Sequence, residues 1–184
     1  MTKIVKGIGR YEEGVYDTLD RAYRIWVGIL DRVTNPPHPC YEGCDVSEEW
    51  RDYQTFAEWY YKHWQRLPGV HLSVDKDLLI PGNKIYGPDY CVMIPKEINT
   101  YIVGCTGAKG YSLDSNCKTP TYRVYLSSRV DGRKRTINVG RTTSPEEAAR
   151  MYREAKQSKL TELAEKYKYC IEPRAYEALL NFHF

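Results

Sequence analysis

The stretch TYRVYLSSRVDGRKRTINVG, residues 121–140, constrains the fold of this chain more than any other part of it. Two runs that contain β-branched and aromatic residues flank Asp131-Gly132, and an Asp-Gly pair in such a position is a strong signal for a two-residue hairpin turn. With those two residues as the turn, Arg129 lies opposite Lys134 across the hairpin. The sequence therefore predicts a β-hairpin with a defined register.

That register gives the hairpin one apolar and one polar face, because successive side chains of a strand point to opposite sides. The apolar face pairs Leu126 with Ile137 and Val124 with Val139. The polar face carries basic, aromatic, hydroxyl and amide side chains, which suit phosphates and base edges. The like-charge pair beside the turn costs stability unless an anion lies nearby. The residues expected to bind DNA on this face are Arg123, Tyr125, Arg129, Lys134, Thr136 and Asn138.

The segment SPEEAARMYREAKQSKLTELAEKY, residues 144–167, is the clearest helix in the chain. Ser144 is a suitable N-cap, Pro145 suits the first helical position, and Glu147 completes a capping box. Its expected core stripe consists of Ala148, Tyr152, Ala155, Leu163 and Tyr167. A small antiparallel sheet packed on this one helix would leave the opposite face of the sheet free.

Charge is divided unevenly along the chain, although the net charge is only +3. Residues 1–100 hold 12 Lys+Arg against 15 Asp+Glu, whereas residues 101–170 hold 14 against 7. A basic second half indicates binding of a polyanion, although a helix rich in Lys and Arg can also be merely solvated. We place a domain boundary where glycines cluster and the charge changes sign, which gives domains 1–103 and 104–184, the second with a C-terminal helical tail.

The first half predicts two helices, within residues 17–33 and 47–64, from apolar residues at helical spacing. The stretch VDKDLLIPGNKIYGPDYC follows, with Asp75 and Asp77 one residue apart. Two close carboxylates before a polar loop can hold a hard cation through their oxygens, or they can be solvated residues at the edge of a strand. His71 alternates onto the same strand face as Asp75, where it could serve as a base or be a surface residue at the strand end.

The spacing of the cysteines bears on zinc binding, and the length of the apolar runs bears on the cellular location of the protein. Cys40 and Cys44 have zinc-like spacing with His38 close by, but no second close pair accompanies them, so we expect free thiols and no zinc. The irregular spacing of the six cysteines does not look like a secreted disulfide framework. No apolar run approaches the roughly 20 residues needed to cross a bilayer, and the start has no stretch of signal-peptide length. We expect a cytoplasmic protein with no membrane partner.

The second half resembles a known DNA-binding domain. The stretches YRVYL, the Asp-Gly hairpin, INVG and TTSPEEAARMYREAK are similar to the small sheet-plus-helix domain of plant ethylene-response factors, relatives of which occur in phage endonucleases. The similarity covers residues 104–168. It implies that the sheet lies in the major groove of double-stranded DNA, with Arg, Trp and polar residues reading bases. This chain has no Trp on the sheet, so Tyr125 would take that place.

The first half resembles the HNH homing endonucleases of tailed phages through AYRIWVGILDRVTNP, YEGCDVSEEWRDYQTFAEWY, VDKDLLIPGNKIYGPDYCVMIP and KEIN, in this order. The resemblance implies an α+β fold in which a ββα-metal unit holds one divalent cation, Mg²⁺ or Mn²⁺. Asp75 matches the metal-binding carboxylate on the first strand, and Asn99 or Glu97 is the candidate ligand on the helix. Lys76 stands where active members have the His general base, and Tyr90 where they have the central Asn, so the unit is degenerate.

The resemblance makes Asp75, Asp77 and His71 the candidate catalytic residues and Asp75 and Asn99 the candidate metal ligands. Because a protonated lysine cannot accept a proton, cleavage of DNA is left open. Three classes of function follow: a phage-type DNA endonuclease, a relative that binds DNA without cutting it, and an inactive relative that inhibits a host nucleic-acid enzyme or defence system. We favour an HNH-endonuclease-like DNA-binding protein, in the host cytoplasm if the chain is phage-encoded.

Overall fold

The computed structural model describes residues 1–65, 67–104, 109–115, 119–130 and 133–184, with the side chains of all of these except 104, 128–130, 133 and 134. They form six α-helices and several small sheets, so the predicted α+β class is confirmed. None of the helices in these ranges is both long and apolar enough to span a bilayer. The chain divides into two compact units, an N-terminal unit of Met1–Pro95 with Tyr169–Ala175 and a C-terminal unit of Lys96–Lys168 with Tyr176–Phe184.

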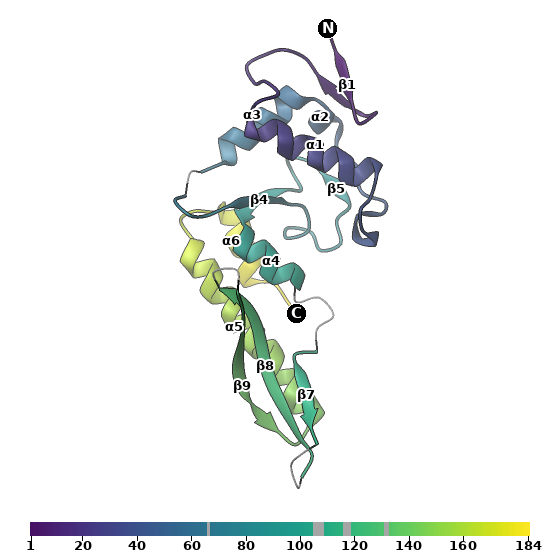
Figure 1. Cartoon of the computed structure of the whole chain (residues 1–184). Coiled ribbons are helices and arrows are strands. Elements are labelled where there is room, and N and C mark those ends of the chain that lie inside the picture. Colours follow the sequence, from purple (N-terminus) through teal and green to yellow (C-terminus); the bar gives the residue numbers. More distant parts are fainter. Residues whose placement is uncertain (66, 105–108, 116–118, 131–132) are drawn as a thin grey trace. The chain divides into compact units, whose positions relative to one another are not determined.

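The N-terminal unit combines three helices with three two-stranded sheets (Figure 1). Strand β1 pairs antiparallel with β2 and β4 with β6, whereas β3 and β5 run parallel. Its elements are β1 (Lys3–Val5), β2 (Gly9–Tyr11), α1 (Arg21–Thr34), a 3-10 helix (Pro39–Tyr41), β3 (Asp45–Val46), α2 (Glu48–Arg51), α3 (Tyr53–His63), β4 (Leu72–Asp75), β5 (Ile85–Tyr86), β6 (Val92–Pro95) and the start of α6 (Pro173–Leu180).

The two helices predicted in this unit form, with one difference each. Helix α1 begins at Arg21 after Asp20 as its N-cap, so Leu19 lies outside it and is exposed. The second predicted helix is divided into α2 and α3 at Asp52, whose carboxylate accepts the backbone N–H of Thr55 at 2.9 Å. A side chain that caps a helix in this way satisfies a donor at the helix start, and so favours a new helix over the continuation of the old one.

An aromatic core holds this unit together. Trp26, Trp50 and Phe56 are fully buried, and the indole N–H of Trp26 donates to the backbone oxygen of Trp50 at 2.7 Å. The segment Tyr169–Ala175 belongs to this unit because the Arg174 guanidinium donates to three backbone oxygens of the turn before β6, at 3.0–3.3 Å. Those three acceptors belong to Pro88, Asp89 and Cys91.

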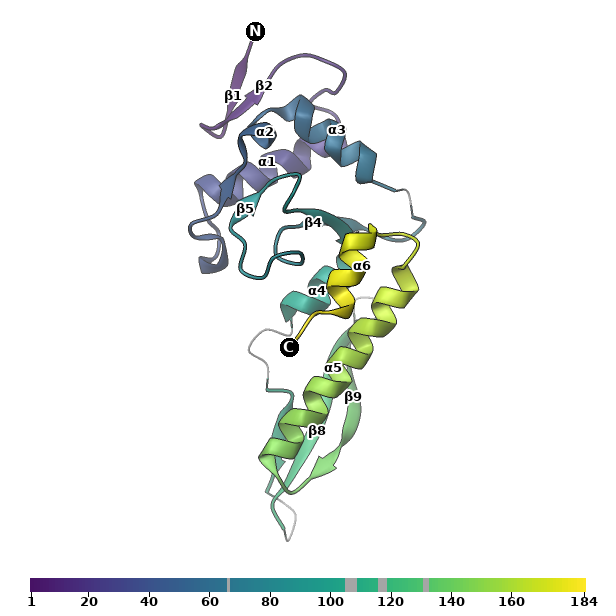
Figure 2. The same cartoon turned by 180° about the vertical axis from the view of Figure 1, so that it is seen from behind.

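The C-terminal unit is built around a three-stranded antiparallel sheet in the order β7-β8-β9. Helix α5 lies along one face of this sheet in both views (Figures 1 and 2). The Ser144 hydroxyl accepts the backbone N–H of Glu147 at 3.2 Å, as the predicted N-cap requires, but the Glu147 carboxylate binds Arg150 and not the backbone of Ser144. The elements are α4 (Lys96–Gly104), β7 (Tyr111–Asp114), β8 (Thr121–Val130), β9 (Arg133–Thr142), α5 (Pro145–Tyr167) and the end of α6 (Pro173–Leu180).

The predicted hairpin register is confirmed over most of its length and fails near its base. Arg129 pairs with Lys134 and Leu126 with Ile137, as expected, while Asp131-Gly132 lies outside the described residues. A register shift between Val124 and Tyr125 then places Val124 opposite Gly140 instead of Val139. A bulge of this kind adds one residue to one strand, and every side chain beyond it changes face relative to an unbroken ladder.

The contact with α5 explains two differences from the predicted apolar face: Gly140 lies on this face, and Ile137 is exposed. Val124 and Leu126 are buried with Ala148 and Tyr152 of α5 in the core of this unit. Gly140 lies against α5 so closely that an added Cβ would come within 2.5 Å of the Met151 methyl carbon. The predicted burial of Ile137 is wrong, because 47% of this side chain is exposed on the part of the hairpin nearer the turn.

Candidate nucleic-acid interface and carboxylate loop

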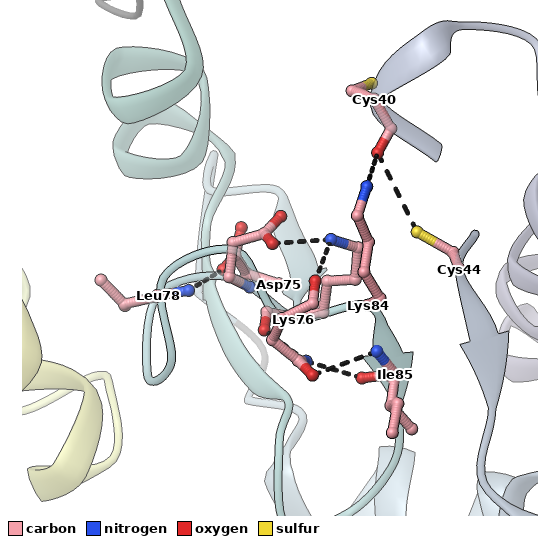
Figure 3. Close-up of polar contacts among 9 residues, drawn as sticks. Cys40, Cys44, Asp75, Lys76, Leu78, Lys84 and Ile85 are labelled. Atoms are coloured by element: carbon pink, nitrogen blue, oxygen red, sulfur yellow. Dashed lines mark hydrogen bonds and ion pairs between the residues drawn. The ribbon is translucent and has the colours of Figure 1, made fainter. Parts of the chain in front are cut away.

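The Asp75 carboxylate shapes the turn that follows β4. Its Oδ1 accepts the backbone N–H groups of Asp77 at 3.0 Å and of Leu78 at 2.7 Å, an arrangement by which Asp commonly stabilises turns (Figure 3). Burial raises the pKa of the Asp75 carboxyl, although the two backbone hydrogen bonds act in the opposite direction. A cation at Asp75 Oδ1 would therefore compete with two hydrogen bonds that the turn already makes.

Lys76 occupies the position of the expected general base, and its side chain is only 5% exposed. Its Nζ donates to Asp77 Oδ1 at 2.6 Å and to the backbone oxygen of Asn83 at 2.7 Å. An ammonium group has three donors and no acceptor, so it cannot take a proton from water. The second candidate carboxylate, Asp77, is thus in an ion pair with a buried lysine.

Asn83 closes the loop that Asp75 opens. Its amide nitrogen donates to the backbone oxygens of Lys76 at 2.8 Å and of Ile85 at 2.7 Å, and its Oδ1 accepts the Ile85 N–H at 3.1 Å. The neighbouring Lys84 Nζ donates to the Cys40 backbone oxygen at 3.0 Å (Figure 3). Asn83 and Lys76 therefore organise the loop, a role that the search for ligands and bases in the sequence missed.

The remaining candidates for a metal centre are divided between the two units. His71 precedes β4 and is exposed, and no hydrogen bond joins it to Asp75 in the structure as described. Asn99 and Glu97 belong to α4 in the C-terminal unit. Within the described ranges no group of three or more His, Cys, Asp or Glu side chains is placed to hold a metal ion.

Glu97 has a structural role within the C-terminal unit. Its Oε2 accepts hydrogen bonds from Lys166 Nζ and from the Tyr167 hydroxyl, both at 2.7 Å, which join α4 to α5. Burial tends to raise the pKa of Glu97, but the bonds from Lys166 and Tyr167 outweigh it and hold the pKa below its ordinary value. The carboxylate is therefore already used as the acceptor of two strong donors.

Four cysteines lie in the described part of the chain, and each is a free thiol: Cys40, Cys44, Cys91 and Cys170. Cys105 and Cys117 lie outside it. Cys91 is fully buried at the start of β6, and burial raises the pKa of its thiol to about 12. The Cys44 thiol faces the backbone oxygen of Cys40 at 4.0 Å. A thiol as weakly acidic as that of Cys91 is a poor nucleophile and a poor metal ligand.

The face of the β7-β8-β9 sheet opposite α5, termed the outer face below, carries the residues expected to bind DNA. Alternation along β8 places Arg123 and Tyr125 there, since the intervening Val124 is buried against α5. The register adds Thr136 and Asn138 of β9, both exposed. Arg129 and Lys134 are partners in the strand register, as predicted, but their side chains are not among those that the structure describes.

The bulge adds an arginine that the sequence prediction missed. Beyond the register shift, Arg141 pairs with Arg123 and therefore shares the outer face, whereas in an unbroken ladder it would oppose Tyr122 and point the other way. Arg141 is exposed, and no acidic side chain among the described residues bonds to it. The single signal in the sequence was Gly140, because a glycine inside a strand often marks a bulge.

Arg123 differs from Arg141 in having a carboxylate partner. Asp114, at the end of β7, is 8% exposed, and its Oδ2 accepts from Arg123 Nε at 2.7 Å and lies 2.5 Å from Nη2. The outer face thus carries one arginine held by a buried carboxylate next to one that is not. Tyr125 and Asn138 form the adjacent cross-strand pair.

Comparison of the chain with protein-family models, with curated proteins and with solved structures finds no match in any of the three.

Proposed function

We propose that this chain binds double-stranded DNA through the outer face of the β7-β8-β9 sheet. The observation that carries the proposal is the pairing of Arg123 with Arg141 across β8 and β9, next to Tyr125 paired with Asn138. Arginines at this spacing suit phosphates or base edges, and amide and aromatic side chains suit base edges and sugars. A two-stranded β-ribbon fits the major groove of B-form DNA.

Two further features support DNA as the ligand. Residues 101–170 hold 14 Lys+Arg against 7 Asp+Glu, an excess of basic residues that attracts a polyanion. Helix α5 covers the inner face of the sheet, where Val124 and Leu126 are buried with Ala148 and Tyr152, so the helix does not compete for the outer face. The resemblance to the sheet-plus-helix domain of ethylene-response factors gives the same orientation, with the sheet toward DNA.

We further propose that the segment from β4 to α4 descends from an HNH-type ββα-metal unit and that the chain cleaves DNA very slowly or not at all. The order strand β4, loop, strand β6, helix α4 supports the first part. The donor set fits Mg²⁺ or Mn²⁺ poorly, because Asp75 Oδ1 accepts two backbone N–H groups and Asp77 is paired with buried Lys76. We therefore derive no catalytic step through a metal.

The contacts of Lys76 also favour a second candidate function, that of an inactive relative that inhibits a host nucleic-acid enzyme by protein contact. A fold freed from catalysis can keep its surface for a partner, and the basic outer face would then meet an acidic protein surface. This candidate predicts tight, salt-sensitive binding to a protein and weak binding to duplex DNA.

Binding to a labelled duplex of mixed sequence, measured by fluorescence anisotropy over a series of salt concentrations, tests the proposal. We expect the logarithm of the binding constant to fall linearly with the logarithm of salt concentration, with a slope of about −0.9 for each phosphate contact on duplex DNA. Phosphate contacts are strongest at low salt, so binding should be easiest to detect at about 50 mM. If the folded chain shows no binding at that concentration, the protein-binding candidate is favoured.

A further inference from the structure

Asp114 is a buried carboxylate on an otherwise exposed surface for a ligand. It lies at the end of the edge strand β7, directly opposite Thr121 of β8, and is 8% exposed. Its Oδ2 holds Arg123, whose side chain is 51% exposed. Burial of a charged group is costly unless the group is paired and hydrogen-bonded, so the arginine satisfies the carboxylate and is held by it in return.

The contacts with Asp114 use only one of the two edges by which the Arg123 guanidinium can donate hydrogen bonds in pairs. Both contacts to Asp114 use the edge formed by Nε and Nη2, at 2.7 and 2.5 Å. The other edge, formed by Nη1 and the second hydrogen of Nη2, makes no hydrogen bond within the described residues. The cross-strand neighbours of Arg123 are Ser112 of β7 on one side and Arg141 of β9 on the other.

A guanidinium whose orientation is fixed by a carboxylate suits hydrogen bonding to guanine better than to a phosphate. Two parallel N–H groups of arginine donate to O6 and N7 of guanine in the major groove, which is the commonest specific contact between proteins and DNA. The rotamer entropy of a free arginine opposes such a fixed geometry, and a buried carboxylate reduces that cost before DNA arrives. Against a phosphate the same carboxylate is a disadvantage, because its negative charge offsets that of the arginine.

Resting on the proposed function, we propose that Asp114 is a positioning residue that holds Arg123 ready to read one guanine. Arg141 has no described carboxylate partner and contributes mainly affinity, through a phosphate. Arg123 thus provides sequence preference, and Arg141 provides affinity through its charge.

The test is selection from a pool of duplexes with a randomised central segment, sequenced before and after binding to the full chain. For the wild-type chain we expect one position at which guanine is preferred by about 5- to 150-fold, the range for one bidentate arginine–guanine pair. Asp114→Asn should weaken the preference at that position alone and leave the salt slope equal or steeper. Arg123→Lys should abolish the preference while it keeps the slope, since the charge is retained.

Arg141→Ala is the matched control. It removes an arginine from the same row of the outer face, so it should lower affinity and flatten the slope while the guanine preference stays. An Asp114→Asn chain that folds and keeps the full preference would overturn the proposal. So would a wild-type chain that binds DNA with a normal salt slope but enriches no guanine, which leaves the proposed function standing. Absence of binding by any of the variants and by wild type would instead refute the proposed function.

A measurement on the wild-type chain covers the case in which Asp114→Asn does not fold. In ¹H–¹⁵N spectra of the free protein, a guanidinium held by Asp114 should give a sharp Nε–H signal for Arg123 that exchanges slowly with water. Arg141 should give a signal that is broadened by exchange. Equal exchange rates for the two side chains would contradict the positioning role of Asp114.

Discussion

At the scale of single residues, Lys76 organises the loop that follows β4. Two of its three donors are used within the loop, on Asp77 and on the backbone of Asn83, and its side chain is buried. The sequence alone indicates that a lysine at this position cannot act as a general base. It could not give the structural role of Lys76, because the burial of this side chain depends on the closure of the loop by Asn83, and loop closure is not a local property.

Loss of the Lys76 side chain should destabilise the N-terminal unit. Lys76→Ala removes the donor to the half-buried backbone oxygen of Asn83, which should lower the free energy of unfolding by about 1–3 kcal/mol. Lys62→Ala, at an exposed lysine of α3 with no described ion pair, should change it by less than about 0.5 kcal/mol. Urea denaturation monitored by tryptophan fluorescence compares the two, and equal effects would show that the contacts of Lys76 contribute nothing to stability.

Asp75 gives a prediction about pH. Burial raises the pKa of its carboxyl, so the folded state binds a proton more readily than the unfolded state, and stability falls as pH rises through the raised pKa. Asp75→Asn keeps an oxygen for the N–H groups of Asp77 and Leu78 without the charge, and it should be at least as stable as wild type at pH 7. That advantage should shrink as the pH falls through the raised pKa. A variant less stable than wild type at pH 7 would show that the charge itself is needed.

At the scale of helices and strands, the sequence predicted the features that depend on interactions between residues close together in the chain. The N-cap at Ser144, the helix that follows and the register near the hairpin turn all depend on a few neighbouring residues, and all are present. The bulge at Val124 and the exposure of Ile137 depend instead on how far α5 extends over the sheet and how closely it packs at Gly140. Such contacts join residues that are distant in sequence, so the alternation of apolar and polar residues along one strand cannot predict them.

Two glycines of the sheet should respond differently to an added methyl group. Gly110 has φ +66°, and a Cβ there would meet the ring of the buried Tyr152. Gly110→Ala should therefore cost at least about 2 kcal/mol, from left-handed backbone strain and from overpacking. At Gly140 the added group meets only the flexible end of Met151, so Gly140→Ala should cost less than Gly110→Ala. Thermal unfolding followed by circular dichroism measures both, and a reversed order would contradict the described packing.

At the scale of the whole molecule, the segment from β4 to α4, which we propose to descend from an HNH-type unit, precedes the sheet that we propose to bind DNA. Hydrogen bonds within the loop after β4 occupy Asp75 and Asp77, the two carboxylates that a metal-dependent cleavage would need. The candidate carboxylates could be found in the sequence, because their spacing is local. The hydrogen bonds that these carboxylates make could not be predicted, because they depend on how Lys76 and Asn83 fold into the loop.

Incubation with supercoiled plasmid should give little or no nicking, with or without Mg²⁺ or Mn²⁺. General acid–base assistance typically contributes about 10²–10⁴ in rate, and Lys76 cannot supply it. Agarose electrophoresis of the relaxed and linear forms is the measurement. Metal-dependent nicking that disappears with Asp75→Ala would show that the unit is an active nuclease, and His71→Ala would then identify whether this exposed residue is the base.

The most direct test of the central claim compares the salt dependence of duplex binding for two variants that each lose one exposed arginine. Arg141→Ala removes a charge from the outer face, and Arg153→Ala removes one from α5, the helix that covers the inner face. We predict that Arg141→Ala flattens the log–log slope by about 0.9, as the loss of one phosphate contact requires, and that Arg153→Ala leaves it unchanged. Equal slopes for wild type and Arg141→Ala, or a flatter slope for Arg153→Ala alone, would contradict binding through the outer face.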